Sequence, residues 1–209
     1  MTPIKDEGII IGIQELKDKD LIVRWITKDY GRLDAVARSA KSSSSRFLGG
    51  IGLYNKCQLM VRYKAERELQ QLSEVTLSSY PSHLIQSLPL LNAVTALCEV
   101  IEQFTEKQTP IPEIYEHLLE FIYVQSANEH VDILKDYIGL EVRLFSGLGI
   151  LPHQLPDELL EFLENPKDRE NTSSLLKRYL NYTEAYISRA HSPHPQKRVK
   201  FLGKNLFKN

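Results

Sequence analysis

Cysteine is scarce in this sequence, with two residues, Cys57 and Cys98, among 209. They lie far apart in the chain, and each falls inside an apolar pattern. A disulfide scaffold or a cysteine-ligated metal site needs more numerous or more closely spaced partners, so both are disfavoured. We expect two buried free thiols in a reducing compartment, and hence a cytoplasmic protein.

Long hydrophobic runs are also absent, since no apolar stretch approaches the roughly 20 residues that a membrane-spanning helix needs. The N-terminal sequence MTPIKDEGIIIGIQEL places acids ahead of its short apolar stretch and has no small-residue cleavage site. These features argue against a secretory signal. The composition, 42% hydrophobic and 25% charged, is that of an ordinary globular protein.

Signatures of catalysis are missing as well. There is no G-x-x-x-x-G-K-[ST] loop, and FLGGIG at 47–52 lacks the strand-to-helix setting of a nucleotide-binding turn. The six histidines are scattered singly or, for His191 and His194, paired without cysteine or carboxylate support. We therefore expect no enzyme activity, no cofactor and no metal site.

The net charge of −1 conceals two basic regions separated by an acidic one. Residues 1–80 carry 13 Lys and Arg against 10 Asp and Glu. Residues 81–170 carry 5 against 16, and residues 171–209 carry 8 against 1. The bias is sharper within 21–67, which holds 10 basic and 3 acidic residues. Local sign determines what a surface attracts, so the basic regions are candidates for binding anionic partners.

The first 80 residues alternate between apolar and polar positions with a period of two, as half-buried antiparallel strands do. Most connections are short enough for hairpins, whereas the link over about 40–53 is longer and rich in serine and glycine. Five short strands in this order predict a small β-barrel, and the OB-fold is the commonest such barrel. The expected strands are 7–16, 20–28, 31–39, 55–64 and 68–77.

Beyond the fifth strand the apolar residues recur at helical intervals instead. Pro89 stands at a first-turn position, where proline favours the start of a helix. Gly147 and Gly149 predict the C-terminal end of another helix. The sequence therefore predicts an α+β protein with two domains. These are an OB-fold barrel over 1–80 and an all-helical domain with a basic C-terminal tail over 81–209.

Basic residues gather on the predicted barrel. Such cations can pair with nucleic-acid phosphates, which makes affinity depend on salt because counterions are released. OB-folds that bind single strands add aromatic side chains for base stacking, and Tyr30, Phe47 and Tyr54 are candidates. The alternative is that the cations only face water, as they do on many proteins. The candidate DNA-binding residues are Arg24, Arg32, Arg38, Lys41, Arg46, Arg62, Lys64 and Arg67.

The C-terminal region is a second basic segment. LLKRYLNYTEAYISRA places Lys177, Arg178 and Arg189 on an otherwise apolar helix, and the basic tail that follows contains Lys197 and Arg198. Two interpretations stay open. Either the region packs against the acidic middle of the chain, or it extends a surface for nucleic acid or an acidic peptide.

Four segments match, in order, the motifs of one known family. GRLDAVARSAKSSSSRF is similar to a glycine, hydrophobic and "vA+GA++" run followed by a basic, serine-rich stretch. KAERELQQLSEVTL resembles a hairpin between fourth and fifth strands that ends in "eL..l.eael". LEVRLFSGLGILP resembles the helix "FElrLL..lGy.P", and KRVKFLGKNLF resembles the closing "k.lkS+.ll.ql". Together these segments resemble the RecO family over most of the chain.

The sequence departs from the family in two places. Many RecO proteins carry a four-cysteine zinc site just after the "lGy.P" helix, where this chain has HQLPDELLEFL and no cysteine. Ile138 and Gly139 stand where members often have basic residues. We therefore expect a form without structural zinc and with a shortened helical region.

The resemblance implies a recombination mediator in DNA repair. Such a protein binds single- and double-stranded DNA, anneals complementary strands, acts with RecR, and helps load the RecA recombinase onto strands coated by single-strand-binding protein (SSB). An SSB tail is acidic and hydrophobic, so a groove lined by Arg143, Lys177 or Arg178 could bind it. The protein would be cytoplasmic, and associated with the nucleoid when bound to DNA.

An alternative from another class is a helical protein-interaction scaffold whose small barrel binds protein and not DNA. A metal-dependent nuclease would need carboxylates clustered among the cations, and Asp29 and Asp34 alone are too few. Binding of an oligonucleotide over a salt series separates the mediator from the scaffold, because only phosphate contacts release counterions.

Overall fold

The computed structural model describes residues 2–123 and 133–151, together with Asp157, Arg178, Tyr179, residues 181–183, Ala185, Ile187 and Arg198. The chain divides into two compact units, Met1–Gln86 with Thr105–Ala127 and Ser87–Phe104 with Asn128–Asn209. The domain limits expected from the sequence, 1–80 and 81–209, remain a prediction.

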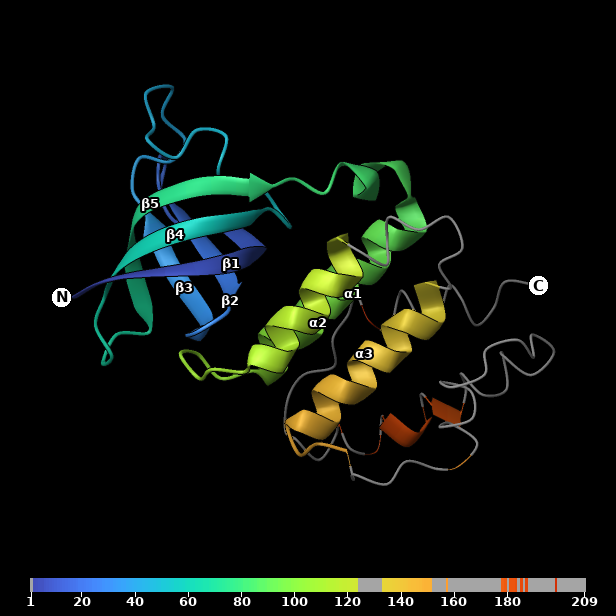
Figure 1. Ribbon diagram of the computed structural model, residues 1–209. Helices are drawn as coiled ribbons and strands as arrows, with labels where there is room; N and C mark the ends of the chain where they lie inside the picture. The colour runs from blue at the N-terminus through green and yellow to red at the C-terminus, as the bar shows by residue number, and fades with distance from the viewer. Residues whose placement is uncertain are drawn as a thin grey trace. The chain divides into compact units, whose positions relative to one another are not determined.

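Five strands form a closed barrel in the first unit (Figure 1). Their order around the barrel is β1-β2-β3-β5-β4, and neighbouring strands are antiparallel except for β3 and β5. This topology confirms the expected OB-fold and the α+β class. The strands are β1 (Thr2–Glu15), β2 (Leu21–Thr27), β3 (Gly31–Ala37), β4 (Lys56–Tyr63) and β5 (Leu69–Ser79).

The alternation of apolar residues supplies the barrel core. Trp25 and Leu33 face each other across β2 and β3, and both are fully buried. Burying one such side chain contributes roughly 1.5–3 kcal/mol, so the core holds the strands in register. As expected, Cys57 and Cys98 are buried free thiols. The core cluster is Ile10, Val23, Trp25, Leu33, Ala35, Ala37, Phe47, Cys57, Leu59, Val61 and Leu72.

The first strand begins earlier than the sequence predicts, at Thr2 instead of residue 7. Its first half pairs with β4, from Thr2 opposite Tyr63 to Ile9 opposite Lys56, and its second half pairs with β2. Ile4 is the one aliphatic residue among positions 2–6 and packs against the core cluster, so this segment carries no apolar alternation. Their extended form depends on hydrogen bonds to β4, which local periodicity does not reveal.

The loop between β3 and β4 folds back onto the barrel. Phe47, 3% exposed, lies within the core cluster. The Gly50 N–H donates to the Phe47 carbonyl at 3.1 Å, and the Asn55 side-chain amide donates to the Gly50 carbonyl at 3.2 Å. The serine- and glycine-rich segment is therefore a folded part of the first unit.

Helix α2 (Pro112–Tyr123) packs on the barrel within the same unit. The Tyr115 hydroxyl donates to the Glu7 carboxylate at 2.5 Å, and Lys56 forms an ion pair with Glu7 at 2.9 Å. Burial raises the pKa of Glu7, but the Tyr115 hydrogen bond and the Lys56 charge together hold this pKa below its usual value. The Tyr123 hydroxyl donates to the Tyr54 carbonyl at 2.7 Å. A short 3-10 helix, η1 (Ser82–Gln86), precedes the second unit.

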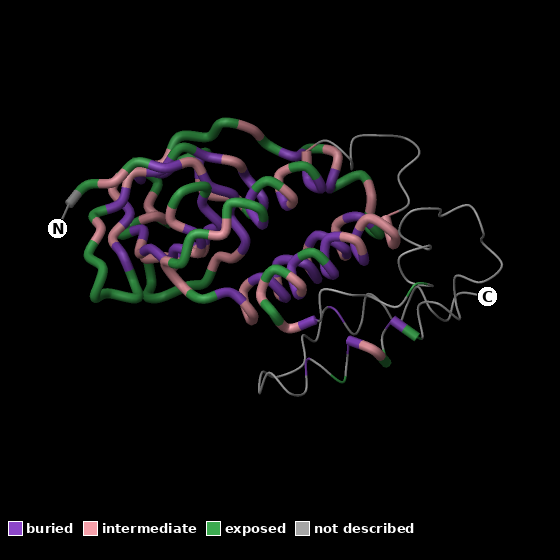
Figure 2. The backbone as a smooth tube through the Cα atoms, turned by 60° about the horizontal axis from the view of Figure 1, so that its bottom comes forward, coloured by how far each residue is buried: buried purple, intermediate pink, exposed green. Residues whose placement is uncertain are grey.

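The second unit contains α1 (Leu88–Phe104) and α3 (Ile133–Gly147), which contact each other. The rings of Phe104 and Phe145 meet edge to face, with centroids 5.2 Å apart. Figure 2 shows buried positions gathered along these helices and inside the barrel. No helix among the described residues is long and apolar enough to cross a bilayer.

Both helix ends foreseen in the sequence occur. Pro89 lies in the first turn of α1, where the Leu90 N–H donates to the Ser87 hydroxyl at 3.4 Å. At the end of α3, Gly149 adopts a φ of 68°. The Ile150 N–H then donates to the Phe145 carbonyl at 2.8 Å, as in a Schellman motif.

We expect Phe47→Ala to lower the free energy of unfolding by about 3–5 kcal/mol, because it leaves a cavity in the barrel core. Its neighbour Leu48 is 68% exposed, so Leu48→Ala is the matched control and should change stability by less than about 0.5 kcal/mol. Urea denaturation followed by Trp25 fluorescence measures both. Equal effects of the two substitutions would contradict the packing of Phe47.

Candidate nucleic-acid interface

The candidate DNA-binding cations fall into two groups according to the loop that each adjoins. Arg24 on β2 is registered with Gly12 of β1, whereas Arg62 on β4 is registered with Pro3. Around the other side of the closed barrel, Arg62 is registered with Gln71, Gln71 with Val36, and Val36 with Ile22, which is two residues from Arg24. The two groups are therefore distinguished by the loops that they adjoin, and not by a distance along a strand. The loop-end group is Arg24, Arg38, Lys41 and Arg46, and the turn-end group is Arg32, Arg62, Lys64 and Arg67.

The loop-end group forms where the β3–β4 loop meets the hairpin between β1 and β2. The Lys41 N–H donates to the Lys19 carbonyl at 3.1 Å, and the Ser39 N–H donates to the Asp20 carboxylate at 2.8 Å. Lys41 also pairs with Glu15 at 2.7 Å. Because these contacts hold the loop against the hairpin, they fix the positions of its cations.

Individual members of the loop-end group differ in exposure. Arg38 and Arg46 are exposed, and the Arg46 guanidinium lies 4.8 Å from the Phe47 ring centroid. Arg24 is half-buried and donates to the Gln14 side chain at 2.5 Å. Sequence reasoning missed two exposed hairpin cations of the same end, Lys17 and Lys19. The alternation of K and D in KDKD hid them, because the segment has no net charge.

The turn-end group surrounds the connection between β4 and β5. Lys64 pairs with Glu66 at 2.7 Å, and Arg62 and Arg67 are exposed. Arg32 is half-buried and donates to the Thr105 carbonyl at 2.9 Å. Since its guanidinium already binds the chain itself, Arg32 is less suited to bind phosphate than the exposed cations are.

Residues 105–109 form a strap across β3. Contacts with this strap explain why Arg32 is half-buried and hydrogen-bonded within the chain. The Gln108 N–H donates to the Arg32 carbonyl at 2.8 Å. Lys107 pairs with Asp34 at 3.0 Å, so the one acid of GRLDAVARSAKSSSSRF is bound within the unit. Gly31, at φ 64°, lets the strap approach, because an added Cβ would lie 1.8 Å from the Thr109 carbonyl oxygen. Nothing in the sequence signals this pairing.

The prediction of base-stacking aromatics is wrong for two of its three residues. Phe47 and Tyr54 are 3% and 6% exposed, so neither presents a ring to a base. Phe47 packs in the core, and the Tyr54 carbonyl accepts a hydrogen bond from the Tyr123 hydroxyl of α2. Tyr30 is half-buried and its ring lies 5.4 Å from that of Tyr63, centroid to centroid. Phe47 and Tyr54 were selected because loop aromatics are usually exposed, and here the loop folds inward.

The residues expected to bind an acidic tail belong to the second unit. Arg143 is exposed on α3, and Arg178 is exposed as well. Lys177 lies outside the described residues. The second unit also contains a buried polar network that the sequence did not single out.

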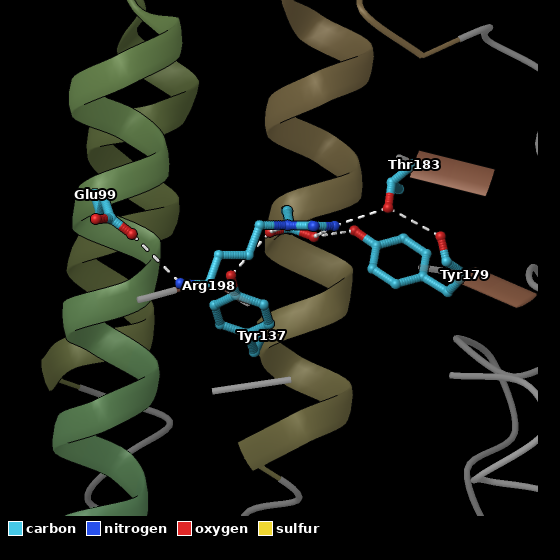
Figure 3. A network of polar contacts seen from close by, with 6 residues as sticks. Glu99, Tyr137, Tyr179, Thr183 and Arg198 are labelled. Carbon is cyan, nitrogen blue, oxygen red and sulfur yellow. Dashed lines mark hydrogen bonds and ion pairs between the residues drawn. The ribbon is translucent and has the colours of Figure 1, made fainter. Parts of the chain in front are cut away.

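The network centres on an ion pair between Glu141 and Arg198, both fully buried (Figure 3). The Arg198 guanidinium donates to the two carboxylate oxygens at 2.6 and 3.0 Å, and to the Thr183 hydroxyl at 2.7 Å. The hydroxyls of Tyr137 and Tyr179 donate to the same carboxylate. Burial, and then the Glu141 charge, raise the pKa of both tyrosines well above its usual value, so they stay protonated donors.

The basic tail was expected either to pack against acidic residues or to extend a binding surface. For Arg198, this network shows which of the two holds. Arg198 binds Glu141 inside the unit, and its N–H donates to Glu99 of α1 at 3.3 Å. Burial lowers the pKa of Arg198, but the Glu141 carboxylate outweighs burial and raises it. For Arg198, the interpretation that the tail packs against acidic residues is therefore correct, and its buried guanidinium is not available to bind a partner.

Metal binding finds no support in the described part of the chain. No three His, Cys, Asp or Glu side chains among residues 2–123, 133–151 and the further described positions are placed to hold an ion.

The fold and the loop-end group define a class, an OB-fold protein with a basic end followed by helices. Residues 1–81 match the family described as "Recombination protein O N terminal". The chain is 29% identical to the DNA repair protein RecO of Listeria monocytogenes serotype 4b (strain CLIP80459) over 150 residues. That match covers 71% of this chain and 56% of the relative.

Other relatives agree. The DNA repair protein RecO of Exiguobacterium sibiricum is 25% identical, over 71% of this chain and 58% of its own length. That of Desulfatibacillum aliphaticivorans is 28% identical, over 73% and 59%. These matches support the RecO family, as the motifs predicted, and the family model covers residues 1–81 of the chain. It spans less than two thirds of the length of these relatives.

We expect Arg198→Met to destabilise the protein by about 3–5 kcal/mol, because it leaves the Glu141 carboxylate buried without its partner. Glu141→Leu should have a similar effect for the opposite reason. The double variant should lose clearly less than the sum of the two, since it removes both charges. Thermal or urea denaturation of the four proteins tests this, and additive losses would contradict the coupling.

Proposed function

We propose that this protein is a recombination mediator in DNA repair, which binds single- and double-stranded DNA through its barrel. The observation that carries the proposal is the gathering of exposed cations on two loops of a barrel that matches the RecO family model. Arg38 and Arg46 are exposed, and the hairpin adds Lys17 and Lys19 beside them. Such cations bind phosphates irrespective of base sequence.

Annealing of complementary strands follows from the same cations. Two DNA strands repel each other through their phosphates, and a basic surface that binds both reduces this repulsion. The step needs no bond to be made or broken in DNA, so no catalytic residue, cofactor or metal is invoked. The protein would act through binding energy alone.

The proposal includes the partners that the family resemblance implies. The protein would act with RecR to load RecA on strands coated by SSB, in the cytoplasm and on the nucleoid. The exposed Arg143 and Arg178 are the cations of the second unit that would pair with the carboxylates of an SSB tail. Lys177, which precedes Arg178 in the sequence, would be a third cation of this site.

We expect the triple variant Arg38→Ala, Lys41→Ala and Arg46→Ala to bind oligonucleotides at least about tenfold more weakly at low salt. Because single strands contribute a slope of about −0.7 per phosphate contact, the salt dependence should flatten by about 2. Fluorescence anisotropy over a salt series measures both values.

The matched control removes three cations from the turn-end group, Arg62, Lys64 and Arg67. It changes the net charge equally, and it should weaken DNA binding less if the loop-end group is the main contact. Equal losses in the two variants would mean that both groups contribute to binding. An unchanged affinity of the loop-end variant would place the surface elsewhere. If the unaltered protein shows no salt-dependent binding, the protein-interaction scaffold is the better interpretation.

We expect Arg143→Ala and Arg178→Ala each to weaken binding of a peptide with an SSB-like acidic and hydrophobic tail by about tenfold, the loss of one charge-assisted contact. Isothermal titration calorimetry measures the affinity. Lys135→Ala, about two turns before Arg143 on α3, is the control for a nonspecific loss of charge. Equal losses for all three variants would count against a defined tail site.

A further inference from the structure

One large apolar side chain of the first unit is exposed at the tip of a folded loop. Leu48 is 68% exposed, although its neighbour Phe47 is 3% exposed. Scattered exposed leucines are ordinary on protein surfaces. Leu48 differs from these in two respects: it stands on a hydrogen-bonded turn, and basic residues lie near it in the sequence.

The turn that carries Leu48 is fixed on both sides. The Leu48 N–H donates to the Ser45 carbonyl at 3.3 Å, and the Gly50 N–H donates to the Phe47 carbonyl at 3.1 Å. Gly49 has a φ of 77°, which turns the chain immediately after Leu48. An added Cβ at Gly50 would lie 2.8 Å from a methyl group of Val75, so the loop lies close against β5. Leu48 therefore stands on a turn anchored by a core residue.

Exposed cations stand near this apolar tip in sequence and on the adjoining hairpin. Arg46 is two residues away and exposed, and Lys41 of the same loop contacts the β1–β2 hairpin. The hairpin repeats the combination, because Leu16 is 41% exposed beside the exposed Lys17. Two adjoining loops thus each present a leucine next to basic side chains. This charge favours a polyanion over an apolar protein surface as the partner.

We infer that Leu48 is a wedge that inserts between the bases of DNA held by the loop-end group. This inference rests on the proposed DNA binding and adds a positioning role to it. DNA-binding proteins insert leucine and similar apolar side chains between base steps, with cations on the flanking phosphates. The wedge takes the place that exposed aromatics have in other single-strand-binding OB-folds, since Phe47 and Tyr54 are buried.

The wedge gives the annealing function a physical basis. A side chain between two bases of a single strand unstacks them while the cations hold their phosphates. The Watson–Crick edges then face outward, where a complementary strand can pair with them. Only a rigidly held side chain can do this, because a mobile one would yield to the stacked bases.

The test uses a single-stranded oligonucleotide with one 2-aminopurine between adenines, whose fluorescence rises when its stacking is lost. The full chain at saturating concentration should raise this fluorescence. Leu48→Ala should lose at least about half of the rise, while its affinity by anisotropy falls less than about fivefold, because phosphate contacts dominate affinity. Leu48→Met, which keeps an apolar side chain of similar length, should restore the rise.

Ile85→Ala is the matched control, since Ile85 is 71% exposed in η1 and outside the two loops. It should behave as the unaltered protein. If the unaltered protein binds DNA but Leu48→Ala keeps the full rise, or no rise occurs, the wedge is overturned and DNA binding stands. If no salt-dependent DNA binding occurs at all, the proposed function fails first, and the wedge with it.

Discussion

The core of a small barrel has to be filled, and here a loop residue takes part in filling it. Phe47 lies in the core cluster with Trp25 and Leu33, which commits the whole β3–β4 loop to the barrel. The cations of that loop, its contacts with the hairpin, and the exposed Leu48 all have fixed positions because Phe47 is buried. A serine-rich segment would otherwise sample many conformations and hold no defined surface. The packing of Phe47, together with the hydrogen bonds between loop and hairpin, thus gives the barrel an organised basic end.

The second unit depends on a different kind of constraint. The Glu141–Arg198 pair is fully buried, and such pairs contribute little net stability because both charges lose their hydration. They do exclude alternative packings, since any other arrangement would leave a charge buried without its partner. Tyr137 and Tyr179 donate to the same carboxylate, so its oxygens are satisfied from several positions in the chain. The network selects one arrangement of the residues that surround α3.

Local patterns in the sequence were sufficient for most of the described elements. Period-two alternation gave all five strands, and Pro89 and Gly149 marked helix ends where the backbone has them. The side-chain partners could not be obtained this way. The hydrogen bond from Arg32 to the Thr105 carbonyl and the ion pair of Glu141 with Arg198 join residues that are far apart in the chain. Periodicity describes which face a residue occupies, whereas such contacts depend on how separate elements come together.

The strap also affects how the protein can be divided. The chain leaves the first unit after Gln86 and returns to it at Thr105, so the barrel, the strap and α2 are not contiguous in sequence. A fragment that ends at residue 81, where the family match ends, would lack the Thr105 carbonyl, Lys107 and Tyr115. Arg32 and Asp34 would then lose these partners, whereas Glu7 would lose Tyr115 but keep its ion pair with Lys56. The stretch that the family model matches and the unit that folds together are therefore different parts of this chain.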